Sequence, residues 1–362
     1  CTSRRTRSGA GIISRRSARF SRVGSPGPPP SAAPPAPAPR MAISPRADLS
    51  NPRRPPRLMF LLLRDSSSVI DALPYVYRSH HALPDTLRDP TGRQSNALVG
   101  FSRFLVDYAL TEEPTHVALC FDCSGGSAFR KKMHAGYKSN RPKAEAPFLD
   151  QLKRCKEFAD ALGMKCFESK KFEADDLIAT LSTAVLSKGH RCTVVTVDKD
   201  LCQLVEPRLS VYDPAGGSRY DEAGVVKKFG VLPCQVVDML GLVGDSADCI
   251  PGVRGIGPRT AAQLLQQFKD LDAVYAGLDK VATLGLRGAA GVQKALAAGQ
   301  DIAFLSRTLA TLEHNVPVQK ASIRGMLRRR PSSDIHTLLD EFGLQSLGRQ
   351  VSRLQRRMDG LP

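Results

Sequence analysis

Three short apolar runs in this chain each end on an aspartate, and this arrangement constrains the fold more than any other feature. The runs are residues 67–71 (SSVID), 117–122 (VALCFD) and 192–198 (CTVVTVD). The second and third are continuous and rich in β-branched residues, as in parallel strands buried on both faces. Between them, residues 149–162 and 177–186 place apolar side chains at helical spacing. Strands that alternate with helices predict an α/β fold with a mostly parallel sheet and flanking helices.

The three strand ends are expected to lie close together. In open parallel sheets the carboxyl ends of the strands meet at one edge, and ligands bind beyond it. Asp71, Asp122 and Asp198 would occupy that edge, with Asp200 two residues further on. A single aspartate after a strand is ordinary turn chemistry, but three at one edge indicate a site. An alternative places the first strand at residues 59–63 (MFLLL), with Asp65 as its terminal acid.

Further acids join this set from two other stretches. Residues 172–176 (FEADD) stand where a helix begins, and residues 244–252 (GDSADCIPG) carry another acidic pair. Acids are favoured at helix starts for structural reasons, but two unit charges 4 Å apart repel by about 4 kcal/mol at an effective dielectric of 20. All-carboxylate ligation suits Mg²⁺ or Mn²⁺ rather than zinc. We therefore expect a divalent-metal site formed by nine acids: Asp71, Asp122, Glu173, Asp175, Asp176, Asp198, Asp200, Asp245 and Asp248.

A basic stretch lies between the second and third strands, at residues 127–141 (SAFRKKMHAGYKSNR). If this stretch is helical, one face carries Arg130, His134, Tyr137, Lys138 and Arg141. Such a face is either solvated or an anion clamp. Beside a carboxylate–metal site, the cations fit a clamp on an anionic substrate.

Three closely spaced glycines stand near the start of residues 251–265 (PGVRGIGPRTAAQLL). Gly252, Gly255 and Gly257 allow a tight turn, and Pro258 suits the first position of a following helix. Backbone N–H groups exposed there can bind a phosphate without reading bases. The pattern is typical of a helix-hairpin-helix that grips DNA; the alternative is a plain turn between two helices.

Residues 1–57 differ in composition from the rest of the chain. They hold twelve arginines and one acid, so they supply +11 of the formal net charge of +17, and they are rich in Pro, Ser and Ala. This composition predicts disorder and resembles an organellar transit peptide. The chloroplast is the favoured destination, and the alternative is the mitochondrion or both organelles. The alternatives are a disordered basic tail, or upstream sequence ahead of a start at Met41. No apolar stretch is long enough for a transmembrane helix.

Nine cysteines are scattered through the chain. An odd number without regular spacing favours reduced thiols over a disulfide framework. Cys120 and Cys123 form a single C-x-x-C motif. We interpret it as two thiols beside a strand end rather than as a zinc site or a redox motif.

Taken in order, these motifs resemble the 5′-nuclease family, which includes the 5′→3′ exonuclease domain of bacterial DNA polymerase I and the flap endonucleases. The resemblance covers about residues 67 to 350 and favours Asp71 over Asp65 as the first acid. It rests on the stretches IDALPYVYRS (70–79), CFD (120–122), FR (129–130), GYKSNR (136–141), FEADD (172–176), VDKDL (197–201) and GDSADCIPGVRGIGP (244–258).

The resemblance implies a PIN/resolvase-like catalytic domain that holds two Mg²⁺ ions, for which Mn²⁺ can substitute, and hydrolyses DNA phosphodiesters. The first ion would be bound mainly by Asp71, Asp122, Glu173 and Asp175, and the second by Asp176, Asp198, Asp200, Asp245 and Asp248. Arg130, Lys138 and Arg141 would act on the scissile phosphate. A K⁺ ion on the hairpin carbonyls is also implied. DNA contacts are expected from Tyr77, Arg78, Tyr137, Gly252, Gly255, Gly257 and Arg259.

Four regions are therefore expected: a disordered transit-like segment at 1–57, a catalytic domain at 58–235, a helical helix-hairpin-helix domain at 236–350 and a basic tail at 351–362. We expect a free-standing, monomeric 5′→3′ exonuclease or 5′-flap endonuclease that works beside an organellar DNA polymerase in replication and repair. The C-terminal residues lack the sliding-clamp motif of flap endonucleases. A PIN-type ribonuclease and a catalytically inactive DNA-binding protein are the alternative functions.

Overall fold

The computed structural model describes residues 66–318 and 323–359. Their framework is a six-stranded sheet with the order β3-β2-β1-β4-β5-β6, in which only β6 runs antiparallel to its neighbour. The predicted α/β class with a mostly parallel sheet is confirmed. The strands are β1 (Ser66–Asp71), β2 (His116–Asp122), β3 (Lys165–Ser169), β4 (Arg191–Val195), β5 (Leu209–Asp213) and β6 (Ser218–Tyr220).

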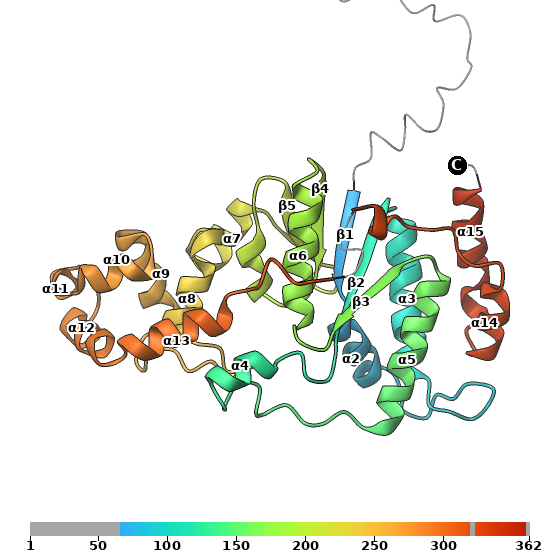
Figure 1. The fold of residues 1–362 in the computed structure, drawn as a ribbon, viewed down its shortest axis with the longest axis horizontal. Helices are drawn as coiled ribbons and strands as arrows, with labels where there is room; N and C mark the ends of the chain where they lie inside the picture. The colour runs from blue at the N-terminus through green and yellow to red at the C-terminus, as the bar shows by residue number, and fades with distance from the viewer. Residues whose placement is uncertain (1–65, 319–322, 360–362) are drawn as a thin grey trace, which may run out of the picture. The chain divides into compact units, whose positions relative to one another are not determined.

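Successive residues of the strands face opposite layers, which explains why the runs are apolar throughout. In β1, Val69 belongs to one buried cluster and Ile70 to the other, and neither is exposed. One layer is formed by α6 (Ala174–Leu186). The other contains α2 (Leu73–Ala82), α3 (Asn96–Thr111) and α5 (Ala146–Ala161), so both faces of the sheet are covered (Figure 1).

A helical part follows the sheet and packs on the α6 side, in the same buried cluster. Within it, α8 (Val236–Val243) and α9 (Pro258–Phe268) are joined by the glycine-rich stretch, and Pro258 begins α9 as predicted. Short connecting elements precede it: the 3-10 helix η1 (Asp200–Leu204), α7 (Glu222–Phe229) and η2 (Pro233–Gln235). The helices of this part are α8 (Val236–Val243), α9 (Pro258–Phe268), α10 (Leu271–Ala276), α11 (Leu278–Val281), α12 (Ala289–Ala298) and α13 (Gln300–Ala310).

The end of the chain differs from the predicted division at residue 350. After η3 (Ile323–Met326), helix α14 (Ile335–Glu341) contacts α5, and α15 (Gly348–Met358) contacts α3 after the short η4 (Gln345–Leu347) (Figure 1). Val351 and Leu354 are buried with the catalytic domain's own core. The basic stretch at 351–362 was expected to be a tail because its arginines dominate, but two apolar residues three positions apart suffice to anchor a helix.

Two other expectations need comment. The strand predicted at residues 192–198 ends at Val195, so Asp198 lies in the following loop. The alternative first strand at 59–63, Asp65 and the transit-like segment lie outside the described residues. In the described part of the chain, no helix is long and apolar enough to cross a membrane.

A candidate carboxylate site at the edge of the sheet

Strands β1 and β2 deliver two aspartates to the same edge of the sheet. Asp71 is the last residue of the central strand and pairs in register with Cys120, two residues before Asp122. The Thr196 hydroxyl, from the loop after β4, donates to Asp71 Oδ2 at 2.9 Å. Asp122 accepts the Ala174 N–H at 2.8 Å and so ties this edge to the first turn of α6. Thr196 was not predicted; its only signal is its place between β4 and Asp198.

The loop after β4 adds the next two acids. The Asp200 N–H donates to Asp198 Oδ1 at 2.8 Å, and the Asp198 N–H donates to Thr196 at 2.9 Å. The side chain of Asp200 also shares a hydrogen bond with Asp245, which arrives from the helical part. A cavity brings most of this set together; its lining includes Glu173, Asp175, Asp198, Asp200 and Asp248.

Burial and crowding oppose ionisation of these carboxyls. Burial, with the nearby charge of Asp122, raises the pKa of Asp71 to about 8. Burial, with the charges of Asp198 and Asp245, raises the pKa of Asp200 to about 8. The pKa values of Asp175 and Asp198 are also raised, first by burial and then by neighbouring carboxylates. The cations near these carboxyls, such as Lys138, therefore do not offset the cost of ionising all of them.

Divalent cations fit this donor set. The ligands offered are carboxylate oxygens, which suit Mg²⁺ and Mn²⁺. In residues 66–318 and 323–359, no group of three or more Asp, Glu, His or Cys side chains is arranged to hold a metal ion by itself. That finding is compatible with Mg²⁺, which keeps several waters and is commonly held by one or two carboxylates together with substrate phosphates.

Helix α6 begins where the sequence predicts, but the side-chain partners of its first acids were not foreseen. Glu173 and Asp176 form a reciprocal capping box at the helix N-terminus. Asp176 is fully buried, and Arg130 engages both of its carboxylate oxygens at 2.7 and 2.9 Å. Glu173 accepts from Arg130 at 2.7 Å and from Tyr137 at 2.9 Å, and Lys138 contacts its other oxygen. Glu173 and Asp175 line the cavity, whereas Asp176 does not.

The predicted cationic face does not form. Helix α4 (Ala128–Met133) ends before His134, and Lys138 has a left-handed backbone with φ of 51°. Arg130, which is expected to act on the scissile phosphate, is only 2% exposed and is paired with Glu173 and Asp176. The exposed cations of α4 are instead Lys131 and Lys132. The glycine in HAGYK (134–138) and the acids that attract Lys138 together explain why the helix stops.

Lys138 and Arg141 nevertheless reach the acidic site. Lys138 contacts Glu173 and lies 3.5 Å from Asp248 Oδ2, and Arg141 forms an ion pair with the other oxygen of Asp248. Neighbouring carboxylates raise the pKa of Lys138 despite its burial, so it stays charged. Arg141 is half exposed and can turn toward a bound phosphate.

Tyr77 and Arg78 lie on α2, next to the edge of the sheet. The Tyr77 ring is partly exposed and stacks on Phe148 at a centroid distance of 4.4 Å. Arg78 is exposed. Both remain available to DNA but touch none of the nine acids through a hydrogen bond or ion pair in the described residues.

The glycine hairpin has one closed and one open side. A Cβ on Gly252 would lie 2.3 Å from the backbone of residues 243 and 244, and the Gly252 N–H donates to Ser306 at 3.0 Å. Gly252 therefore allows close packing of the chain on itself. Gly255 has a φ of 91°, and neither it nor Gly257 has a neighbour within 4 Å of a Cβ. Arg259 is exposed beside them. Gly255, Gly257 and Arg259 thus present the surface that a phosphate backbone could approach.

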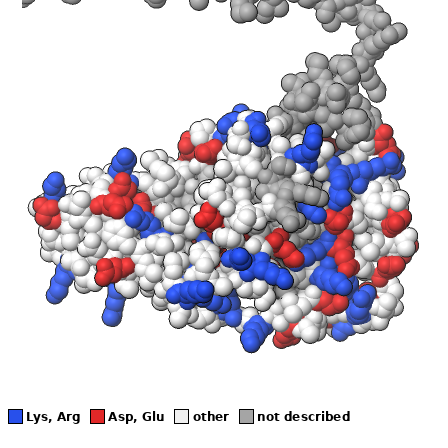
Figure 2. Space-filling model, in the orientation of Figure 1, with Lys and Arg blue, Asp and Glu red and all other residues white. Residues whose placement is uncertain are grey.

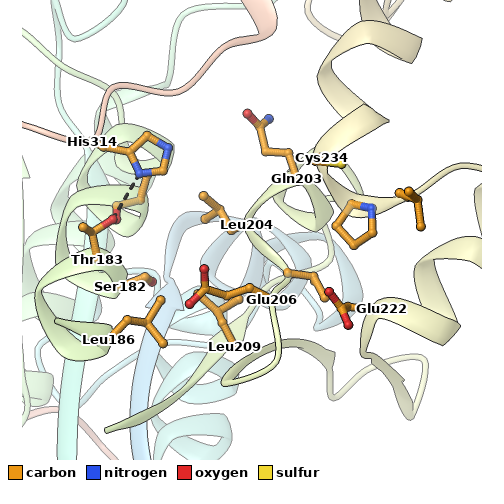
Figure 3. A pocket seen from close by; sticks show the side chains of 14 residues that line it. Ser182, Thr183, Leu186, Gln203, Leu204, Glu206, Leu209, Glu222, Cys234 and His314 are labelled. Atoms are coloured by element: carbon orange, nitrogen blue, oxygen red, sulfur yellow. Dashed lines mark hydrogen bonds between the residues drawn. The ribbon is translucent and has the colours of Figure 1, made fainter. Parts of the chain in front are cut away.

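A pair of cysteines and a second cavity also need comment. Cys120 is buried and Cys123 half-buried, both as free thiols, and burial raises the pKa of Cys120. A cavity of about 390 Å³ lies between α6, η1 and η2, and it contains none of the nine acids (Figure 3). Its size alone does not make it the catalytic centre, because the acidic set does not line it.

Two family models match consecutive parts of the chain. The model of the 5′-3′ exonuclease N-terminal, resolvase-like domain matches residues 66–230. The model of the 5′-3′ exonuclease C-terminal SAM fold matches residues 231–332. The boundary between them lies close to the predicted one at residue 235.

Among curated proteins, the chain is similar to bacterial DNA polymerase I. It is 35% identical over 263 residues to the enzyme of Rhizobium leguminosarum, which covers 70% of this chain and 25% of that protein. It is 37% identical over 249 residues to that of Pseudomonas aeruginosa, covering 68% and 27%. The chain thus spans between a quarter and a third of the length of these relatives.

Solved structures share the fold at low identity. A bacteriophage T5 flap endonuclease in complex with DNA and metal ions matches with a TM-score of 0.57 at 16% identity, over 80% of this chain and 98% of that one. The catalytic core of Rad2 in complex with DNA substrate matches with a TM-score of 0.57 at 16% identity, over 81% and 94%. Since the two family models together cover residues 66–332, the chain belongs to the 5′-3′ exonuclease family.

Proposed function

We propose that this protein is a divalent-metal-dependent nuclease that hydrolyses DNA phosphodiesters at 5′ flaps and 5′ ends. The observation that carries the proposal is the gathering of buried carboxylates with raised pKa values beside the cations Lys138 and Arg141. Acids alone would suggest only a metal site. Acids next to cations, with an open glycine hairpin in the same fold, suit a substrate that is a phosphodiester in a longer strand.

Two sets of acids would bind the metal ions. Asp71, Asp122, Glu173 and Asp175 would hold one Mg²⁺ or Mn²⁺ ion, and a second would be held by Asp198, Asp200, Asp245 and Asp248. Such a pair of ions makes water a better nucleophile and offsets the charge on the attacking and leaving oxygens.

Lys138 and Arg141 would neutralise the scissile phosphate and hold it in line with the acids. Their present partners, Glu173 and Asp248, belong to the acidic set, so each cation can exchange a carboxylate for a phosphate oxygen without leaving the site. The N–H groups near Gly255 and Gly257, with a K⁺ ion on loop carbonyls, would hold a backbone phosphate of the duplex. Tyr77 and Arg78 are proposed as further DNA contacts, whereas Tyr137, expected among them, is buried and donates to Glu173.

Three substrates and two metals test the proposal. Purified protein should cut a 5′-flap DNA, and a nicked duplex more slowly, in Mg²⁺ or Mn²⁺, and EDTA should stop both reactions. An RNA strand of the flap sequence is the matched comparison, because a PIN-type ribonuclease would prefer it. Binding of flap DNA without cleavage in any metal would indicate a catalytically inactive binding protein.

We further propose that the protein works as a monomer in an organelle, in the chloroplast rather than the mitochondrion, beside an organellar DNA polymerase. The support is the composition of residues 1–57, whose arginines are accompanied by a single acid. A fluorescent reporter fused behind residues 1–57 should enter an organelle. A cytosolic or nuclear signal would contradict this part of the proposal.

A further inference from the structure

Arg130 uses every hydrogen-bond donor that its guanidinium has. Its Nε donates to the Leu309 carbonyl at 3.0 Å. One terminal nitrogen donates to Glu173 at 2.7 Å and to Asp176 at 2.9 Å, and the other donates to Asp176 at 2.7 Å and to the Thr311 carbonyl at 3.0 Å. A guanidinium has five N–H groups, and all five are engaged. No donor remains for a substrate.

These partners come from two separate parts of the fold. Glu173 and Asp176 form the start of α6, whereas Leu309 and Thr311 lie at the C-terminal end of α13. Arg130 therefore joins the turn that carries the acids to the last helix of the helical part.

The segment that leaves α13 is fastened along α6 by the same face of that helix. Asp176 accepts the Glu313 N–H at 2.9 Å, and the Thr180 hydroxyl accepts the Val316 N–H at 3.1 Å. Thr183 and His314 lie 3.1 Å apart, as the dashed line in Figure 3 shows. Residues 176, 180 and 183 share one side of a helix, so this contact runs along α6 and is not confined to one point.

Helix α13 also holds the glycine hairpin. The buried Ser306 hydroxyl accepts the Gly252 N–H at 3.0 Å, and α8, which precedes the hairpin, packs on α13. The hairpin, α13, Arg130 and the start of α6 thus form one continuous set of contacts between the proposed DNA grip and the proposed metal site.

We propose that Arg130 is a positioning residue that fixes Glu173 and Asp176 against the end of α13, and that Asp176 serves this ion pair instead of a metal ion. The inference rests on the proposed function, because it assigns the role of residues within that site. Lysine cannot replace the planar guanidinium of arginine, and its loss would remove the ion pair of the buried Asp176 and one of the partners of Glu173.

The test compares Arg130→Lys with a matched control, Arg154→Lys. Arg154 is equally buried and pairs with Asp89 and Asp150 at 3.0 and 2.7 Å, but it lies in α5 on the other side of the sheet. Both variants lose a buried fork, so both should lower the melting temperature. Only Arg130→Lys should reduce the rise in melting temperature that Mn²⁺ produces. It should also raise the Mn²⁺ concentration for half-maximal cleavage by about 10–100-fold, as loss of a partner that orients metal ligands does.

Two further results decide the proposal. Affinity for flap DNA in EDTA should change equally little in the two variants, because the hairpin remains. If Arg130→Lys keeps the wild-type response to Mn²⁺ in both melting and cleavage, Arg130 is a structural residue only and the proposal is overturned. The melting measurement needs no cleavage. A wild-type protein that binds Mn²⁺ but cuts no DNA would therefore contradict the proposed function, while the effect of Arg130→Lys on the melting response to Mn²⁺ could still be measured.

Asp176→Asn completes the experiment. It preserves shape but removes the charge that Arg130 pairs with, and it carries the same test if Arg130→Lys does not fold. Since the two residues act as one unit, the double variant should respond to Mn²⁺ no worse than either single variant. Additive losses would show that Asp176 binds metal independently of Arg130.

Discussion

Lys138 and Asp248 are joined at two points although 110 positions separate them in the chain. The Lys138 N–H donates to the Asp248 carbonyl at 2.9 Å, and the ammonium lies 3.5 Å from the carboxylate. The left-handed backbone of Lys138, which costs a non-glycine residue about 1–2 kcal/mol, makes this double contact possible. The basic segment and the second acidic pair are therefore held in one site.

Lys138→Ala should slow cleavage far more than it weakens DNA binding. A buried cation beside the reacting phosphate stabilises charge that develops in the transition state, so turnover at saturating flap DNA should fall by about 10²–10³-fold. Lys132→Ala, which removes an exposed cation of α4, is the control and should leave turnover within about 2-fold. Equal losses in turnover and affinity for Lys138→Ala would make it an ordinary phosphate contact.

Asp198→Asn should abolish cleavage and leave DNA affinity largely intact, since it removes charge from the proposed metal site without touching the hairpin. Asp213→Asn is the matched control, because Asp213 also ends a parallel strand of the same sheet but stands outside the acidic set. The measurements are single-turnover cleavage in Mg²⁺ and flap binding in EDTA. Cleavage by pure protein without any divalent metal would refute the mechanism.

Gly257→Ala should weaken binding of duplex-containing flaps without unfolding the protein. Its φ of −99° suits alanine, and nothing lies within 4 Å of the added Cβ, so the methyl group meets only an approaching strand. Hydrolysis of short single-stranded DNA should be unchanged. Gly291→Ala, an equally open position within α12, should not affect flap affinity. A folded Gly257→Ala protein that binds flaps normally would show that the hairpin is only a turn.

Stability of the metal-free protein should fall as the pH rises from about 5 to about 8. Asp71 and Asp200 keep their protons up to a pKa of about 8 in the folded state, whereas the ordinary value is 3.8. Between these values the folded state binds more protons than the unfolded state, so rising pH favours unfolding. Melting curves in EDTA should show this slope, and Asp71→Asn should reduce it. A melting temperature that rises over this range would contradict the buried-acid account.

Leu354→Ala should destabilise the catalytic domain, although it lies beyond the region that the sequence assigned to a fold. Leu354 is 1% exposed in the core beside α3, and deleting such a side chain costs about 2–5 kcal/mol. Arg353→Ala, on the exposed face of α15, should change stability by about 0.5 kcal/mol or less. Urea unfolding followed by circular dichroism distinguishes the two. If both variants unfold at the wild-type urea concentration, α15 contributes nothing to the core.

Features that depend on neighbouring residues can be predicted from the sequence. Apolar runs that end on Asp71 and Asp122 specify buried parallel strands, because both faces of such strands are covered. Acids before the apolar pattern of residues 177–186 specify the start of α6, and Pro258 specifies the start of α9. In each case the residues that predict the element lie within the element itself or within one turn of it.

Which charged residues are buried together depends instead on packing between distant parts of the chain. Arg130 looks like a surface cation in its own segment, yet its partners lie 43, 46, 179 and 181 positions away. Its burial required α13 to return to α6, just as the burial of Leu354 required α15 to return to α3. A charged side chain leaves water only when partners replace its solvation, and those partners are brought together by packing across the whole fold, which local spacing does not encode.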